Sequence, residues 1–209
     1  MNAPLPKERY RWRQLTPDKQ KDLLAWRKAQ GNPWHSPPHR EAETQQYHIT
    51  AACFEHHPYI GHSMERMQQF STTLLSTIRS SSIHLHAWCV LPNHYHLLVK
   101  TDDIFVTLKE LGKMHGRTSF LWNGEKNSRG RQVWCNAVER SMRNERHYWA
   151  TLNYIHNNPV HHRYAAKWQD WPFSSSEDYL ASIGADQAKV IWKQYPVLAY
   201  GKGWDDAEL

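Results

Sequence analysis

The sequence has few of the features that mark secreted or membrane proteins. It has three cysteines among 209 residues and no C-x-x-C pair, so we expect neither a zinc ribbon nor a disulfide framework. No apolar run approaches the roughly 20 residues that a membrane-spanning helix needs. Residues 1–10 lack the apolar core of a signal peptide. There is also no internal repeat or low-complexity tract. These absences predict a soluble protein of the cytoplasm.

Positive charge and aromatic rings are plentiful. The formal net charge is +6, and the chain contains 11 tryptophans and 10 tyrosines. A basic, aromatic-rich surface suits a partner with phosphates and stackable bases. The charge alone fits a solvated basic surface equally well. The length suits one domain with extensions. We predict a basic helical extension with a Pro-rich linker at 1–45, a central domain at 46–180 and a C-terminal extension at 181–209.

Hydrophobic periodicity and cap residues predict alternating strands and helices. After a first helix at 16–31, the expected order is strand, helix, strand, strand, helix, strand, helix. The ranges are a strand at 47–54, a helix from 64, strands at 83–91 and 94–100, a helix at 104–122 interrupted at Gly112, a strand at 132–139, and a helix from Asn144 to about Pro159. This order predicts an α+β sandwich with a mainly antiparallel, ferredoxin-like sheet flanked by helices.

Two short stretches carry side chains suited to chemistry. LPNHYHLLV at 91–99 is predicted as a strand, which puts His94 and His96 on one face. YIHNNPV at 154–160 is predicted as a helix end, where Tyr154 and Asn158 share a face four residues apart. Two imidazoles, an amide oxygen and a phenol could then converge. Such a set suits Mg²⁺ or Mn²⁺ beside a nucleophilic tyrosine.

Each of these patterns also has a plainer interpretation. An isolated H-x-H pair is more often strand surface than a metal site, and His84 and His86 repeat the spacing. Asn158 is also suited to be a helix C-cap. Tyr148, the other tyrosine of the predicted helix, has Leu152 at the fourth position and is expected to pack in the core.

Three motifs in order make the pattern specific. LPNHYHLLV, YIHNNPV and WPFSSS at 171–176 resemble the HUH single-tyrosine transposases, and within them the REP-associated tyrosine transposases. The resemblance covers about residues 45–180. It implies that His94 and His96 form the HUH pair, that Asn158 is the third metal ligand and that Tyr154 is the nucleophile. Many insertion-sequence members have glutamine where Asn158 stands, which leaves the metal geometry open.

The resemblance also implies an activity and a partner. The activity is a metal-dependent single-stranded DNA endonuclease and strand transferase, acting through a 5′-phosphotyrosine. The partner is hairpin-forming repetitive extragenic palindrome DNA in a bacterial cytoplasm, with the protein at the nucleoid when it acts. A monomer is favoured over a homodimer.

Basic clusters near the predicted site are candidates for DNA contact, although a solvated face is as good an interpretation. They are Lys113, Arg117, Lys126, Arg129, Arg131, Arg140 and Arg143. Trp122 and Trp134 could stack on bases, but core packing is the commoner use of tryptophan.

Two alternatives compete with this interpretation. The first is a domesticated hairpin-binding protein that no longer cleaves DNA. The second is a two-histidine phosphoesterase, because His48-Ile49-Thr50 has the H-x-T form. That class needs a second H-x-T, and the sequence contains no other.

Overall fold

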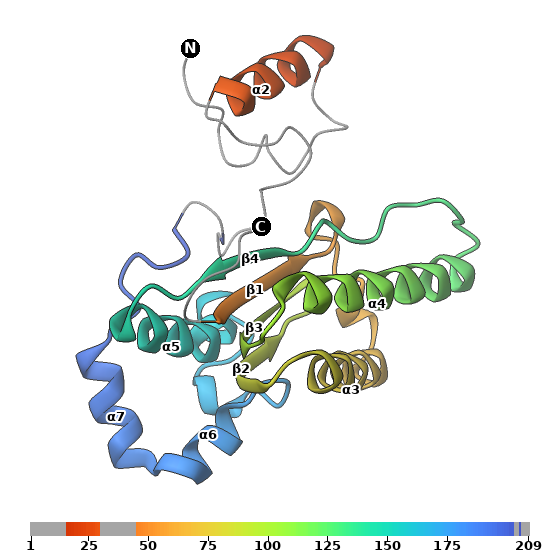
Figure 1. Cartoon of the computed structure of the whole chain (residues 1–209). Coiled ribbons are helices and arrows are strands. Elements are labelled where there is room, and N and C mark those ends of the chain that lie inside the picture. Colours follow the sequence, from red (N-terminus) through yellow and green to blue (C-terminus); the bar gives the residue numbers. More distant parts are fainter. Residues whose placement is uncertain (1–15, 30–44, 203–204, 206–209) are drawn as a thin grey trace.

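A computed structural model describes residues 16–29, 45–202 and 205 (Figure 1). Helix α2 spans Pro17–Ala29, as expected, and the Thr16 hydroxyl accepts a hydrogen bond from the Lys19 N–H at 3.4 Å. The predicted helix end at Gly31 and most of the predicted linker lie outside the described residues. The division into extensions and a central domain stays a prediction. Within the described ranges, no helix combines the length and apolar character needed to cross a membrane.

A four-stranded antiparallel sheet lies at the centre of the molecule. Its strands are β1 Gln46–Ala52, β2 His84–Val90, β3 His94–Lys100 and β4 Val138–Ser141, in the order β2-β3-β1-β4. The helices occupy the connections that the periodicity indicated. The predicted α+β fold with an antiparallel, ferredoxin-like sheet is therefore confirmed.

Helices cover both faces of this sheet (Figure 1). α3 Met64–Ser81 and α4 Ile104–Glu125 pack on one face, and α5 Glu145–His161 packs on the other. Side-chain oxygens of Ser63, Asp103 and Asn144 cap the starts of α3, α4 and α5. The remaining elements are the short helices η2 Phe54–His56, η3 Ile60–His62 and η4 Trp168–Asp170, followed by α6 Ser176–Ile183 and α7 Ala185–Gln194.

Alternate side chains of β3 point to opposite faces of the sheet. Tyr95 points into the core under α3 and α4, where its hydroxyl bonds His115 Nε2 at 3.0 Å. His94 and His96 point to the opposite face, toward α5. Both histidines are buried. The sheet therefore holds the two imidazoles on a rigid, central strand.

Three predicted boundaries were wrong. α4 runs through Gly112 without a break, because its buried face supplies more stability than the ~1 kcal/mol that a helical glycine costs. The fourth strand starts only at Val138, since the preceding chain turns Trp134 into the core. α5 continues past Pro159 to His161, and the His162 N–H closes its last turn on the Asn158 carbonyl at 3.0 Å.

Candidate active site

Strand β3 and helix α5 bring the four predicted site residues together. His94 and His96 come from the start of β3, while Tyr154 and Asn158 lie one turn apart on α5. The His94 Nε2 is 3.0 Å from the Asn158 amide oxygen, and the His96 and Tyr154 rings are 5.2 Å apart. All four side chains are buried. Their roles as ligands and nucleophile remain predictions.

A carboxylate from the end of the chain lies at the centre of this group. The Tyr154 hydroxyl donates a hydrogen bond to Asp205 Oδ2. The Asn158 Nδ2 donates to the same oxygen at 2.8 Å. The Nε2 atoms of His94 and His96 are each 3.7 Å from an Asp205 oxygen. All four predicted residues therefore face Asp205, to which the sequence analysis assigned no role.

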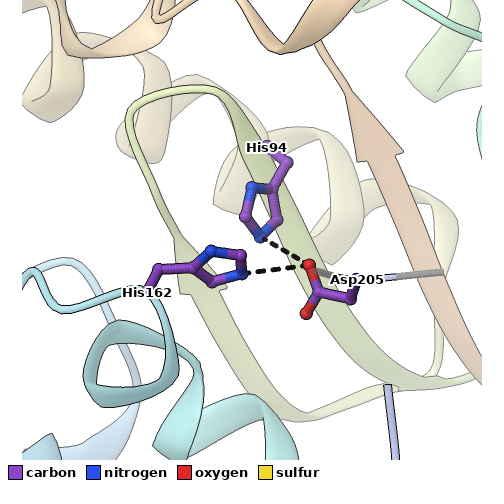
Figure 2. Close-up of side chains that lie close together, drawn as sticks. All are labelled: His94, His162 and Asp205. Carbon is purple, nitrogen blue, oxygen red and sulfur yellow. Dashed lines mark hydrogen bonds and ion pairs between the residues drawn. The ribbon is translucent and has the colours of Figure 1, made fainter. Parts of the chain in front are cut away.

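Two further histidines hold Asp205 from the end of α5. His162 Nε2 is 3.0 Å from Asp205 Oδ1, and His161 Nε2 is 3.0 Å from the Asp205 carbonyl oxygen. Figure 2 shows His94 and His162 turned toward the same carboxylate oxygen. Burial raises the pKa of the Asp205 carboxyl, but hydrogen bonding and charge interaction with His96, aided by His94 and His56, outweigh it and lower the pKa. Asp205 is therefore ionised at neutral pH.

The hydrogen bonds assign the protonation of His94. Its Nδ1 is 2.7 Å from the Asn93 side-chain oxygen, which can only accept, so the proton is on Nδ1. Burial is the main cause that lowers the pKa of His94 well below 6.5, so the ring is neutral. Its Nε2 lone pair then faces the Asn158 oxygen. The His94 Nε2 and the Asn158 oxygen, both acceptors 3.0 Å apart, would repel each other unless a cation or a proton lay between them.

His96 is oriented from behind by strand β1. Its Nδ1 is hydrogen bonded to the Thr50 hydroxyl and is 3.1 Å from His48 Nε2. These contacts direct the Nε2 of His96 toward Asp205. The H-x-T sequence of His48 and Thr50 thus supports the histidine of the neighbouring strand. This is the outer-shell arrangement common around metal-binding histidines.

The donor set fits a divalent cation. His94, His162 and Asp205 each offer a ligand atom, and these atoms lie within 4.8 Å of one another. The Asn158 oxygen adds a further acceptor beside His94. Neutral imidazole with carboxylate and amide oxygens suits Mg²⁺ or Mn²⁺. The group could therefore hold a metal ion, and the residues do not decide which one.

Tyr200 and Gly201 pack directly on Tyr154. The Tyr200 and Tyr154 rings are 4.8 Å apart, and the Tyr200 hydroxyl contacts the Thr151 hydroxyl at 2.8 Å. Gly201 has a φ of +92°, and a Cβ there would lie 2.8 Å from Tyr154 Cε2. Only glycine lets the chain pass so close to the ring. Tyr200 and Gly201 thus cover Tyr154.

The basic residues predicted to contact DNA fall into two groups. Arg140 is on β4 opposite His48, and Arg143 precedes α5, so both lie on the side of Tyr154. The others lie on α4 or on the loop after it, in the layer on the opposite face of the sheet: Lys113, Arg117, Lys126, Arg129 and Arg131. Lys113 pairs with Glu110 at 2.6 Å.

The remaining aromatic and histidine candidates pack internally. Trp122 and Trp134 are both buried in the core under α3 and α4. Tyr148 contacts His86 Nδ1 through its hydroxyl at 3.1 Å, which accounts for one histidine of the second H-x-H pair. The expectation that these residues serve packing agrees with the structure.

Asp205 and His162 are the site residues that sequence reasoning missed. His162 had a weak signal, because it lies one turn beyond Asn158. Asp205 had none, since it lies 47 residues beyond Asn158 and no local spacing links the two.

Two comparisons relate the chain to known proteins, while no family model matches it. The REP-associated tyrosine transposase of Escherichia coli (strain K12) is 30% identical over 112 residues, which cover 52% of this chain and 63% of that relative. A solved REP-associated tyrosine transposase, bound to a REP hairpin, has a similar fold with a TM-score of 0.54 and 21% identity. That match covers 70% of this chain and 86% of the solved one. The resemblance to the REP-associated tyrosine transposases that the three motifs predicted is therefore confirmed.

Proposed function

We propose that this protein is a metal-dependent nuclease and strand transferase for single-stranded DNA that folds into a hairpin. One observation carries the proposal: the Tyr154 phenol, the Asn158 amide and the His94 and His96 imidazoles meet at one buried point. A phenol beside a cation site is suited to attack a phosphodiester. The relative of known structure is bound to a REP hairpin, which supports the choice of substrate.

Tyr154 is the nucleophile in this proposal. Its oxygen attacks the scissile phosphorus, the bond from phosphorus to the 3′ oxygen breaks, and the products are a free 3′-OH and a 5′-phosphotyrosine. Rejoining reverses the exchange with the 3′-OH of a DNA strand. The phosphotyrosine conserves the bond energy, so no nucleotide cofactor is needed.

His94, His96 and Asn158 are the proposed holders of the divalent ion, with His162 as a further donor beside them. Bound Mg²⁺ or Mn²⁺ would offset negative charge on the phosphate. Asn93 and Thr50 orient the two rings so that each Nε2 would be available to the ion. Arg140 and Arg143, on the Tyr154 side, are the proposed contacts for the phosphates near the cleaved bond.

The test is covalent capture of a labelled single-stranded hairpin with its flanks, with and without Mn²⁺, on a denaturing gel. We expect a metal-dependent protein–DNA adduct in the wild type and none in Tyr154→Phe. Tyr148→Phe is the matched control, because it removes a hydroxyl from the same helix and should retain the adduct. An adduct that persists in Tyr154→Phe would contradict the assignment. Binding without any adduct in the wild type would favour the non-cleaving hairpin-binding alternative.

A further inference from the structure

A groove of about 600 Å³ opens where α3 begins and α4 ends. Its lining includes Tyr59, His62, Arg66, Trp122, Lys126 and Arg131. This α3–α4 groove is on the face of the sheet opposite to α5 and plays no part in the chemistry proposed for Tyr154. Its volume falls within the roughly 300–1,000 Å³ of ligand-binding pockets.

Two cations in the groove are available for a ligand. Arg66 is not one of them, since its guanidinium already forms an ion pair with Glu125 and donates a hydrogen bond to the Tyr59 carbonyl oxygen at 3.1 Å. In contrast, no carboxylate of the described residues forms an ion pair with Lys126 or Arg131. The groove therefore has a net positive charge that favours a phosphate.

The buried Asn123 fixes the position of the Arg131 side chain. Asn123 accepts from the Arg131 Nε at 2.9 Å and donates to the Arg131 carbonyl at 2.8 Å. The same asparagine accepts the Ser128 N–H through its own carbonyl at 2.8 Å, which fixes the loop. The Arg131 guanidinium then lies over the Tyr59 ring, 4.5 Å from its centre. A preorganised guanidinium on an aromatic ring is a surface on which a nucleic-acid base can stack.

The wall of the groove is attached to the turn that leads into the active site. The Gly61 N–H donates to the Pro92 carbonyl at 2.9 Å, and Asn93 Nδ2 donates to the His56 carbonyl at 3.2 Å. Asn93 also orients His94 through its side-chain oxygen. A strand held in the groove would thus be fixed relative to His94.

We propose that the α3–α4 groove binds a short segment of single-stranded DNA, with Lys126 and Arg131 on its phosphates and the Arg131–Tyr59 stack beneath a base. The choice of DNA rests on the proposed function, but binding in the groove does not require cleavage.

The experiment measures fluorescence anisotropy of a labelled, hairpin-free single strand of about 10 nucleotides, the scale of single-strand binding sites. It uses the full chain carrying Tyr154→Phe, in EDTA, so that neither the metal nor the nucleophile contributes. We expect Lys126→Gln and Arg131→Gln each to raise Kd about threefold or more and to reduce the salt slope by about 0.7, the loss of one phosphate contact. Lys189→Gln on α7, an exposed lysine away from the groove, is the control and should match the parent.

A Kd and salt slope that stay at parental values in both groove variants would overturn the proposal. A photocrosslink from 5-iododeoxyuridine in the same strand gives a second measurement that needs no substitution. Crosslinks at Tyr59 support the groove, and crosslinks confined to other surfaces contradict it. The two proposals fail separately: loss of the Tyr154 adduct with groove binding retained refutes only the cleavage chemistry.

Discussion

At the scale of single residues, the site depends on the groups that contact the far side of the His94 and His96 rings. The Nδ1 of His96 is in hydrogen-bond contact with Thr50 and His48, and the Nδ1 of His94 is in hydrogen-bond contact with Asn93. Each contact leaves Nε2 to face Asp205. The H-x-T pair that suggested a phosphoesterase is therefore explained by its contacts with His96 on the next strand.

Thr50→Val should weaken Mn²⁺ binding by about tenfold, the lower end of the effect of losing an outer-shell partner. Valine keeps the shape of threonine but removes the hydroxyl that orients His96. Isothermal titration calorimetry measures the affinity, Thr50→Ser should restore it, and Thr72→Val on the exposed face of α3 is the control. Wild-type affinity in Thr50→Val would show that the hydroxyl does not orient His96.

At the scale of elements, helix α5 has two buried sides that contact different parts of the molecule. Tyr154 and Asn158 face the site, while His156 faces the following chain. The His156 Nε2 is 2.9 Å from the Ser175 hydroxyl, and its ring stacks on Trp168 at 5.5 Å. Burial lowers the pKa of His156 to about 3. His156, as a neutral imidazole, therefore holds α5 against the chain that follows it.

This anchor makes stability depend on pH. Below pH 6.5 the unfolded chain binds a proton at His156 that the folded chain refuses until about pH 3, so stability is lost as the pH falls through this window. We expect His156→Gln to lose less stability than the wild type between pH 7 and pH 5. The difference should approach about 1.4 kcal/mol per pH unit below pH 6.5.

Urea unfolding at the two pH values measures this difference. His57→Gln, at an exposed histidine, controls for the replacement itself. Parallel loss of stability in the wild type and in His156→Gln would show that His156 is not the source.

At the scale of the whole molecule, Tyr200, Gly201 and Asp205 bring a part of the chain far from α5 in sequence against the site. Asp205 accepts hydrogen bonds from Tyr154, Asn158 and His162, and in the proposed reaction an incoming phosphate would have to reach Tyr154 at the place that this carboxylate fills. One anion must leave before another can bind there. The packing of Gly201 against Tyr154 shows how closely the segment is fitted.

Asp205→Ala should therefore speed adduct formation with the hairpin, by about a hundredfold or more if two charge-assisted hydrogen bonds of about 1.5–3 kcal/mol each are removed. Gly201→Ala should also speed it, because a methyl group would push the segment away from the ring while leaving the carboxylate chemistry intact. Single-turnover gels measure both rates. Slower reaction in Asp205→Ala, with faster reaction in Gly201→Ala, would instead make Asp205 a needed metal ligand.

Much of the fold could be predicted because its signals are local. Apolar spacing in α3, the caps at Ser63, Asp103 and Asn144, and the two strands around Pro92 each depend on a few neighbouring residues. The boundaries that failed were set at a distance. Trp134 is drawn into a core built by α3 and α4, which delays the fourth strand.

The strand that aligns His94 with His96 and the helix that aligns Tyr154 with Asn158 could be predicted from local residues, because side-chain periodicity is a property of each element. The meeting of these two elements at one point, the orientation of the imidazoles by Thr50 and Asn93, and the contact with Asp205 arise only in the folded chain. Those contacts connect residues up to 111 positions apart, as between His94 and Asp205, and no local pattern records them.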